Sequence, residues 1–237
     1  MFADTLLDID RYENWGVIGR GQSGTVVERY HSLEDRLFAV KFIDVPERLS
    51  EREAVQKEFL REVEALLRLK HPCIISYCGC FLPRARDLQP RLGIALDFKR
   101  TSLDKVIHGT HPQPWWNATA KSIVVAGLAL SLRHVHGRGF IHRDLKPSNV
   151  LLDDDHRPCL ADFGITVRTS VAITGVVGTL QYMAPEQTEE GYTNKVDVWA
   201  FGTIIWEIFS GEVPFSGLEP GKILRRVCEG ERQPIPE

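Results

Sequence analysis

Apolar and polar residues follow two different rhythms along the chain and divide it near residue 98. In residues 1–98, short segments rich in β-branched and aromatic residues predict strands. These segments are residues 15–31, 37–45, 73–82 and 91–98. Between them, residues 50–69 carry apolar side chains at helical spacing, which predicts one amphipathic helix. Ser50, followed by Glu53 three residues later, resembles a capping box and predicts that the helix begins there.

From Lys99 onward the apolar positions recur with a helical period. Helices are predicted over residues 102–109, 116–139, 194–211 and 217–230. Residues 194–211 are apolar on nearly every side, which predicts a helix buried in the middle of this part. The pattern therefore predicts an α+β fold with two lobes, a β-rich lobe of residues 1–98 and a larger, mostly helical lobe of residues 99–237. A hinge is expected near residues 97–100, and a cleft between lobes is the usual place for a ligand.

Composition and net charge limit the kinds of partner and the location that we expect for this chain. The chain is 43% hydrophobic and 26% charged, as in ordinary soluble proteins, and its net charge of −3 gives no reason to bind nucleic acid or an anionic membrane. The five cysteines are odd in number and unevenly spaced, which suits reduced thiols and a cytoplasmic location. The acidic N-terminus does not resemble a secretory signal. The longest apolar run, residues 123–130, is too short for a transmembrane segment and predicts a buried helix.

A glycine-rich segment lies early in the predicted sheet. Gly19, Gly21 and Gly24 follow a G-x-G-x-x-G spacing, and Val26 comes two residues after the last of them. Glycines allow a backbone to approach phosphate groups closely. The same spacing occurs in dinucleotide-binding folds, where the loop opens a helix, whereas this one leads into a predicted strand. The residues therefore argue against a nicotinamide-dependent oxidoreductase and leave open a phosphate-binding hairpin or a simple turn.

Lys41 interrupts an otherwise apolar predicted strand. It shares one face of that strand with Ala39 and Ile43, so it is either a lysine on the solvent face or a half-buried cation. A half-buried cation needs an anionic partner, which Glu62 on the following helix, or phosphate oxygens, would supply.

A second polar interruption occurs in residues 139–152, "GFIHRDLKPSNVLL". Apolar residues flank Arg143, Asp144, Lys146 and Asn149 on both sides. This is either an ordinary polar turn between core segments or a site that the core holds in place.

Five short motifs occur along the chain in an order that is typical of a known family. They are "GRGQSGTV", "AVK", "HRDLKPSN", "DFG" and "APE", spread over nearly the whole chain between residues 15 and 236. In order and approximate spacing they resemble a eukaryotic protein kinase catalytic domain. The resemblance implies a bilobal protein-kinase-like fold, with ATP and Mg²⁺ as cofactors and transfer of the γ-phosphate to a protein hydroxyl.

The resemblance also implies roles for residues of the second lobe. Asp144 would be the base that orients the substrate hydroxyl, and Lys146 would neutralise charge on the transferred phosphate. Asn149 and Asp162 would hold magnesium. Thr179 corresponds to a threonine that bridges the base and the lysine in this family.

Nucleotide binding would fall mainly on the first lobe. By resemblance, Lys41 would contact phosphates and be held by Glu62, and both count among the catalytic residues. The positions implied to bind the nucleotide are Ile18, Gly19, Arg20, Gly21, Gly24, Val26, Ala39, Lys41 and Leu151. His142 matches a packed structural histidine of the family rather than a base.

An activation segment would run from Asp162 to Glu186. Arg143, next to the base, is the type of residue that pairs with an activating phosphate in this family. Thr174 is the expected acceptor, with Thr169 and Ser170 as rivals, for an upstream kinase or for self-phosphorylation.

Lys146, two residues after Asp144, follows the serine/threonine pattern, and several segments resemble the tyrosine-kinase-like group of serine/threonine kinases. Protein substrates with serine or threonine acceptors are therefore expected, and nucleic acid is not. The family pattern continues past the last residue here, through further helices and an arginine partner for Glu186. We accordingly expect a domain truncated at its C-terminus and less stable than usual.

Two classes of function stay open, an active kinase and a truncated or non-catalytic kinase-like interaction module. Degenerate members of the family usually lose part of one residue set, and this chain keeps all of it: Lys41, Glu62, Asp144, Asn149 and Asp162. The sequence therefore favours an enzyme.

Overall fold

The computed structural model describes residues 5–21, 24–84, 89–111, 113–169 and 177–236. The chain forms two compact units. Unit 1 comprises Met1–Lys70 and Ile75–Lys99, and unit 2 comprises His71–Ile74 and Arg100–Glu237. Along the chain, the main boundary thus falls between Lys99 and Arg100, and a short segment of the first half belongs to unit 2.

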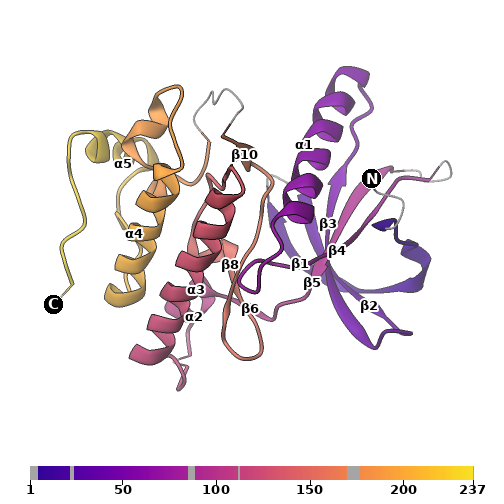
Figure 1. Cartoon of the computed structure of the whole chain (residues 1–237), viewed down its shortest axis with the longest axis horizontal. Coiled ribbons are helices and arrows are strands. Elements are labelled where there is room, and N and C mark those ends of the chain that lie inside the picture. The colour runs from indigo at the N-terminus through magenta and orange to yellow at the C-terminus, as the bar shows by residue number, and fades with distance from the viewer. Residues whose placement is uncertain (1–4, 22–23, 85–88, 112, 170–176, 237) are drawn as a thin grey trace. The chain divides into compact units, whose positions relative to one another are not determined.

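Unit 1 is built on an antiparallel sheet of five strands in the order β1-β2-β3-β5-β4 (Figure 1). The strands are β1 (Tyr12–Gly21), β2 (Gly24–His31), β3 (Arg36–Asp44), β4 (Tyr77–Phe81) and β5 (Arg91–Asp97), preceded by a 3₁₀ turn, η2 (Ile9–Arg11). All four segments predicted as strands contribute, although the third begins only at Tyr77. Strands that follow one another along the chain pair in β1–β2, β2–β3 and β4–β5, whereas β5 separates β3 from β4.

The strand β3 lies between β2 and β5 and has two different faces. Phe38, Val40 and Phe42 point to one face, where they pack in a buried cluster with aromatic residues of β1 and β4. The alternate residues Ala39 and Lys41 therefore point to the other face.

The helix α1 (Leu49–Arg68) follows β3 and lies against the sheet of unit 1 (Figure 1). Its apolar stripe is buried, as the helical spacing predicts. The expected capping box is wrong, because the helix starts at Leu49 with Arg48 as its N-cap and no side chain caps it. Ser50 is therefore already inside the first turn, where it cannot occupy the capping position.

Unit 2 is mostly helical. Its helices are α2 (Leu103–His108), α3 (Ala118–Gly137), α4 (Lys195–Ser210) and α5 (Pro220–Cys228). Short strands form two small sheets: β10 (Val167–Arg168) pairs with β7 (Phe140–Ile141), and β8 (Val150–Leu152) lies between β6 (Thr101–Ser102) and β9 (Pro158–Leu160). Three 3₁₀ turns complete it: η3 (Pro147–Asn149), η4 (Leu180–Tyr182) and η5 (Pro185–Thr188). The four predicted helices are all present.

The helix α3 is amphipathic rather than buried all round. Asn117 caps its start, since the side-chain oxygen accepts hydrogen bonds from the backbone N–H of Thr119 and Ala120. One stripe is buried, but Ile123 and Leu130 are each about half exposed. The expectation of a wholly buried run over residues 123–130 is therefore wrong, because its two ends lie on the solvent face of the helix.

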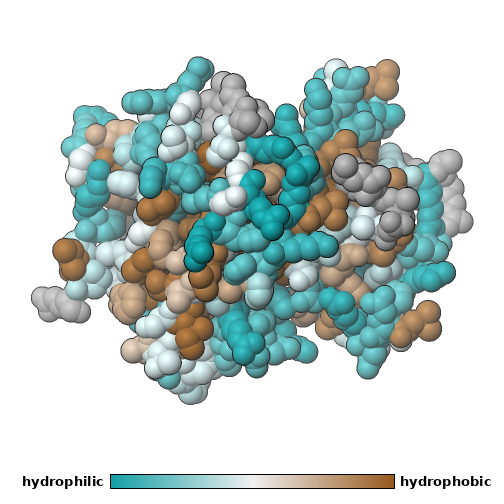
Figure 2. All heavy atoms as spheres, viewed as in Figure 1, coloured by the Kyte–Doolittle hydropathy of each residue, from teal (hydrophilic) through white to brown (hydrophobic). Residues whose placement is uncertain are grey.

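The helix α4 is buried along one face only. Val196, Ala200 and Ile204 are buried, whereas Val198 and Phe209 are about half exposed. Figure 2 shows hydrophobic side chains gathered over this part of unit 2. The predicted helix is thus correct, but its burial on every side is not.

All five cysteines are free thiols, and burial raises the pKa of Cys78 to about 11. None of the helices in the described ranges combines the length and the apolar character that crossing a bilayer requires.

Candidate functional site

The polar turn, residues 142–149, is the part of unit 2 richest in chemistry. It leaves β7 and ends in the 3₁₀ turn η3, directly before β8. The apolar residues around it, Ile141, Leu145 and Val150, are almost completely buried. The core thus holds the backbone of the polar turn on both sides, and the polar side chains between these anchors contact one another.

Asp197, on α4, fixes the backbone at the start of the polar turn. Its side chain is only 1% exposed, and its oxygens accept hydrogen bonds from the backbone N–H of His142 and of Arg143, both at 2.9 Å. His136 Nε2 lies 2.8 Å from the same carboxylate. Arg143 has a left-handed φ of 72°, a conformation that costs a non-glycine residue about 1–2 kcal/mol. The buried carboxylate therefore helps to hold the backbone in a strained conformation.

His142 is a structural residue. Its ring is fully buried, with Nδ1 accepting a hydrogen bond from the backbone N–H of Asp144 at 3.3 Å. On the other side, Nε2 lies 3.0 Å from the carbonyl oxygen of Ala161. This pattern is that of the neutral ring protonated on Nε2. Both nitrogens are used to position backbone, so neither is available as a base, in agreement with the sequence.

Asp144 stands at the centre of a compact polar cluster. One of its oxygens, Oδ2, lies 2.7 Å from Lys146 Nζ, and Oδ1 accepts a hydrogen bond from Thr179 Oγ1 at 2.8 Å. Lys146 Nζ also donates to Thr179 Oγ1 at 2.9 Å. Asn149 Nδ2 donates to the carbonyl oxygen of Asp144 at 2.8 Å and to Oδ2 at 3.2 Å. The structure thus brings four residues singled out from the sequence into mutual contact, including the bridge expected of Thr179.

Asn149 and Asp162 offer oxygen ligands in the same unit. Both hydrogen bonds of the Asn149 side chain use its nitrogen, so its amide oxygen takes part in neither. Asp162 has a left-handed φ of 58°, and its Oδ1 accepts a long hydrogen bond from Gly164 N at 3.4 Å. An amide oxygen and a carboxylate are hard donors, the kind that Mg²⁺ prefers. The donor set therefore fits that ion.

Unit 1 contains a buried ion pair. Lys41 Nζ lies 2.8 Å from Glu62 Oε1 and 2.9 Å from Oε2, linking β3 to α1. The two residues are only 5% and 3% exposed. Buried charges of this kind persist only when paired, so the pair fixes the helix against the strand at one point. It is the pairing that the resemblance implies, and it decides between the two alternatives that the residues alone left open for Lys41.

The glycine-rich segment forms the end of a hairpin. Gly21 pairs with Gly24 across β1 and β2, and a strand rather than a helix follows, which excludes the dinucleotide-binding arrangement. A Cβ on Gly24 would lie 2.2 Å from the carbonyl oxygen of Phe42, and φ there is 130°. Position 24 therefore requires glycine. Gln22 and Ser23 lie outside the described residues.

The remaining nucleotide positions are distributed over both units. Ile18, Gly19 and Arg20 lie on β1, Val26 on β2 and Ala39 on β3, all in unit 1. Leu151 lies on β8 in unit 2, where it is partly buried.

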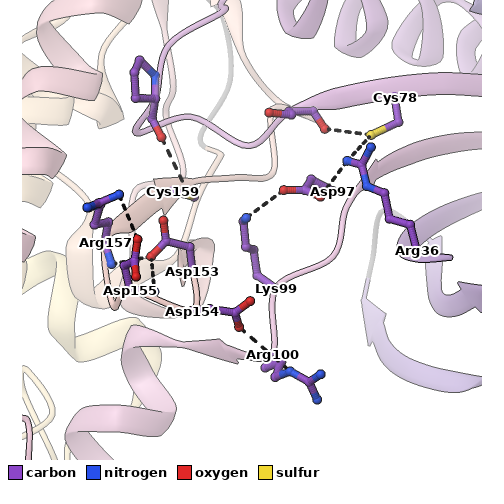
Figure 3. A network of polar contacts seen from close by, with 12 residues as sticks. Arg36, Cys78, Asp97, Lys99, Arg100, Asp153, Asp154, Asp155, Arg157 and Cys159 are labelled. Atoms are coloured by element: carbon purple, nitrogen blue, oxygen red, sulfur yellow. Dashed lines mark hydrogen bonds and ion pairs between the residues drawn. The ribbon is translucent and has the colours of Figure 1, made fainter. Parts of the chain in front are cut away.

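A polar network at the end of β5 was not foreseen from the sequence (Figure 3). Asp97 accepts hydrogen bonds from Arg36 at 2.8 Å and from Lys99 at 2.7 Å. Burial alone would raise the pKa of Asp97, but the bonds from Lys99 and Arg36 outweigh it and hold that pKa below its usual range. The available signal was an acidic residue, Asp97, followed closely by the basic residues Lys99 and Arg100.

Arg143 has a second set of contacts through its side chain. Its Nε donates to the carbonyl oxygen of Ile165 at 2.6 Å, and its guanidinium lies 3.5 Å from the hydroxyl of Tyr192. Of the three proposed phosphate acceptors, Thr169 is exposed and its backbone N–H donates to the carbonyl oxygen of Gly139 at 2.9 Å. Thr174 and Ser170 lie outside the described residues.

A buried glutamate of α4 forms another group that sequence reasoning missed. Glu207 is 1% exposed, and its oxygens lie 2.7 Å from Tyr182 Oη and 2.7 Å from His108 Nε2. Burial raises the pKa of Glu207, against the opposing effect of these two hydrogen bonds. Burial and the nearby carboxylate also raise the pKa of Tyr182. The signal for Glu207 and Asp197 was an acidic residue inside an otherwise apolar helix.

The chain is similar in sequence to known proteins. The chain is 32% identical over 212 residues to serine/threonine/tyrosine-protein kinase HT1 of Arabidopsis thaliana, which covers 86% of this chain and 52% of that protein. It is 32% identical to the probable serine/threonine-protein kinase drkA of Dictyostelium discoideum over 78% of this chain and 29% of that protein. Human ribosomal protein S6 kinase alpha-3 is 32% identical over 94% of this chain and 30% of its own length.

The chain therefore spans about half of one of these relatives and less than a third of the other two. The family model described as protein kinase domain matches residues 12–233. With the motifs, the α+β architecture and the polar cluster around Asp144 in agreement, the chain belongs to the protein kinase domain family.

Proposed function

We propose that this chain is an ATP-dependent protein serine/threonine kinase domain that transfers the γ-phosphate of ATP to protein hydroxyls. The observation that carries the proposal is the contact between Asp144, Lys146 and Thr179. Phosphoryl transfer needs positioning and neutralisation of charge more than covalent help from the protein. A carboxylate and an ammonium group held 2.7 Å apart on an anchored turn suit both needs.

In this proposal Asp144 orients the acceptor hydroxyl and takes its proton, because it is the carboxylate of the cluster. Lys146 keeps a positive charge beside it, where negative charge accumulates on the transferred group. Thr179 and Asn149 restrict both side chains, so the reacting groups need little reorganisation.

We assign the phosphates of ATP in unit 1 to the ammonium group of Lys41, oriented by Glu62, and to the backbone of the glycine hairpin. The residues assigned to the nucleotide are Ile18, Gly19, Arg20, Gly21, Gly24, Val26, Ala39 and Lys41 in unit 1, and Leu151 in unit 2. The small or apolar members, Val26, Ala39 and Leu151, suit the adenine ring.

Asn149 and Asp162 would hold Mg²⁺ through their oxygens, with phosphate oxygens and water completing the coordination. Mg²⁺ bound there would add positive charge next to the phosphate groups. Asn149 keeps its amide oxygen for this purpose because Asp144 accepts both hydrogen bonds from its nitrogen.

Serine/threonine specificity is supported by the position of Lys146, two residues after Asp144, and by its hydrogen bond to Thr179. The relative drkA is named a probable serine/threonine-protein kinase, and HT1 is named a serine/threonine/tyrosine-protein kinase. We propose activation by phosphorylation at Thr174, by another kinase or by the chain itself, with Thr169 and Ser170 as rivals and Arg143 as the phosphate partner.

The test is transfer of labelled phosphate from ATP and Mg²⁺ to matched peptides that offer serine, threonine or tyrosine. Asp144→Asn is expected to lower the rate by about 10²–10⁴-fold, the usual contribution of general base catalysis. Asp154→Asn is the matched control, since that carboxylate is 94% exposed in the same unit, and it is expected to keep full activity. Transfer mainly to the tyrosine peptide would overturn the specificity, and equal rates for both variants would overturn the role of Asp144.

A further inference from the structure

An open pocket of about 400 Å³ lies at the C-terminal end of α3, within unit 2. Its lining is His71, Leu130, Arg133, His134, Gly137 and Arg138. None of these residues belongs to the polar cluster around Asp144 or takes part in the proposed phosphoryl transfer. The pocket combines two arginines with two histidines and contains no acidic residue in its lining.

The two arginines carry positive charge that no acidic side chain balances. In the described part of the chain, neither Arg133 nor Arg138 forms an ion pair, although Arg36, Arg157 and Arg225 all do. The end of a helix carries a negative partial charge equivalent to about half an elementary charge, which attracts cations. Two guanidinium groups exceed that partial charge several-fold, so a positive excess remains at the pocket.

The histidines add hydrogen-bonding capacity. Nδ1 of His71 accepts a hydrogen bond from the backbone N–H of Cys73 at 3.0 Å, so in the neutral ring the proton is on Nε2, which can donate. The rings of His71 and His134 lie 5.1 Å apart between centroids. Nε2 of His134 is buried and has no hydrogen-bond partner among the described residues. Such a nitrogen beside a cationic pocket is a polar group whose hydrogen-bonding capacity an oxygen of a bound anion would satisfy.

We propose that this pocket binds a phosphate-type dianion, either free or as a small phosphomonoester, through Arg133, Arg138 and the two histidines. Guanidinium groups present planar arrays of donors that match the oxygens of such anions. The volume is large enough for an esterified phosphate as well as a free one. The inference does not depend on the kinase activity proposed above.

Occupancy of the pocket should be linked to protonation. Burial lowers the pKa of His134, and the charges of His71 and Arg138 lower it further. These are the groups that act on His134 from its own helix and from the facing segment, and all of them are basic. A bound dianion would reverse this effect and favour the protonated ring. Affinity is therefore expected to increase as the pH falls through the range where His134 titrates.

The experiment follows the histidine ring resonances of the whole chain by NMR while sodium sulfate, inorganic phosphate or O-phosphoserine is added. Resonances are assigned with His71→Gln and His134→Gln. Sulfate keeps a constant charge, so it separates the titration of the protein from that of phosphate. We expect saturable shifts of His71 and His134 with all three dianions, and none with sodium chloride at the same ionic strength. Shifts equal to those in chloride would overturn the proposal.

Arginine variants test whether the positive charge of the pocket is needed for anion binding. Arg133→Gln and Arg138→Gln are each expected to weaken sulfate binding about tenfold, the effect of losing one charged hydrogen-bonding partner. Arg157→Gln is the matched control, an exposed arginine of unit 2 that pairs with Asp155, and it should leave the affinity unchanged. Equal weakening by Arg157→Gln, or no weakening by the pocket variants, would contradict a specific site.

Gly137 allows a steric test that removes no charge. It lines the pocket, and a Cβ added there would have no atom within 4 Å. Gly137→Leu should therefore fold normally, as far-UV circular dichroism would show, while its side chain competes with the anion for space. We expect weaker sulfate binding, and unchanged binding in a folded variant would overturn the assignment of the pocket.

Discussion

The carboxylate of Asp197 accepts a hydrogen bond from the backbone N–H of Arg143 at 2.9 Å, and Arg143 holds a left-handed φ of 72°. The two residues are 54 positions apart in the chain. A helix of the core thus determines the backbone conformation immediately before Asp144. The geometry of the polar turn depends on this long-range contact as well as on its own sequence.

Asp197→Asn tests this dependence. The amide replaces one acceptor oxygen with a donor, so at least one backbone N–H of the polar turn loses its partner. We expect a loss of about 1–3 kcal/mol in the free energy of unfolding, measured with urea. Phosphate transfer should fall even under conditions where the variant is fully folded. Asp155→Asn, at an exposed carboxylate, is the control, and equal behaviour of the two variants would contradict the argument.

Lys41→Met tests the buried ion pair in unit 1. Removing one partner leaves the carboxylate of Glu62 buried without its cation, which typically costs about 3–5 kcal/mol of stability. The double variant Lys41→Met/Glu62→Leu removes both charges and should recover most of that loss, while transfer activity stays low in both. Urea unfolding and labelled-ATP assays measure the two effects. A double variant no more stable than Lys41→Met would contradict the cost assigned to the unpaired carboxylate of Glu62.

Gly178→Ala tests the bridge made by the next residue. Gly178 has φ of 115°, and a Cβ there would lie 2.7 Å from the carbonyl oxygen of Arg143. The backbone must therefore shift, which should displace Thr179 from Asp144 and Lys146 and lower the rate of transfer at least tenfold.

Gly202→Ala is the contrasting glycine substitution. It lies exposed within α4, and a Cβ there would meet no atom within 4 Å. It should keep full activity and gain up to about 1 kcal/mol from helix propensity. Similar losses of activity in both glycine variants would refute the special role of position 178.

Glu207→Gln tests the buried carboxyl group of α4. The pKa of Glu207 lies above its ordinary value of 4.5, because burial disfavours the charged form more than His108 and Tyr182 favour it. The folded state therefore binds this proton more tightly than the unfolded state. The resulting stability is fully present below about pH 4.5 and is lost as the pH rises through the folded pKa.

Urea unfolding of both proteins at a series of pH values measures this effect. Wild-type stability minus that of Glu207→Gln should decrease as the pH rises above about 4.5, by no more than about 1.4 kcal/mol per pH unit. A difference that stays flat, or that increases, would contradict the raised pKa.

Local patterns were enough to predict much of the fold and the candidate site. The strands and helices follow from spacing. The pairing of Lys41 with Glu62 was one of two alternatives that the residues offered for Lys41, and the resemblance favoured it. Lys146 and Asp144 are only two positions apart in the chain, so a short sequence motif includes both residues of this contact.

Long-range contacts explain what the sequence left out. Asp197 and Glu207 lie in an apolar helix, and nothing near them in the sequence shows that their partners are His142, Arg143, Tyr182 and His108. Only the cost of burying an unpaired carboxylate could have indicated that partners exist.

The remaining errors concern helix α1 and helix faces. Ser50 was expected to cap a helix that begins one residue earlier. The apolar segments of α3 and α4 were expected to be buried throughout, but apolar composition does not tell which face a neighbouring element covers.

The hydrogen bonds from the polar turn to Asp197 have a consequence for amide exchange. The N–H groups of His142 and Arg143 are outside regular strands and helices, yet their acceptor is a buried carboxylate on α4. Deuterium can replace these protons only when α4 separates from the turn, so they should exchange as slowly as amides in the core. The hydrogen bonds of the segment that carries the proposed base are therefore expected to open only as often as α4 separates from the turn.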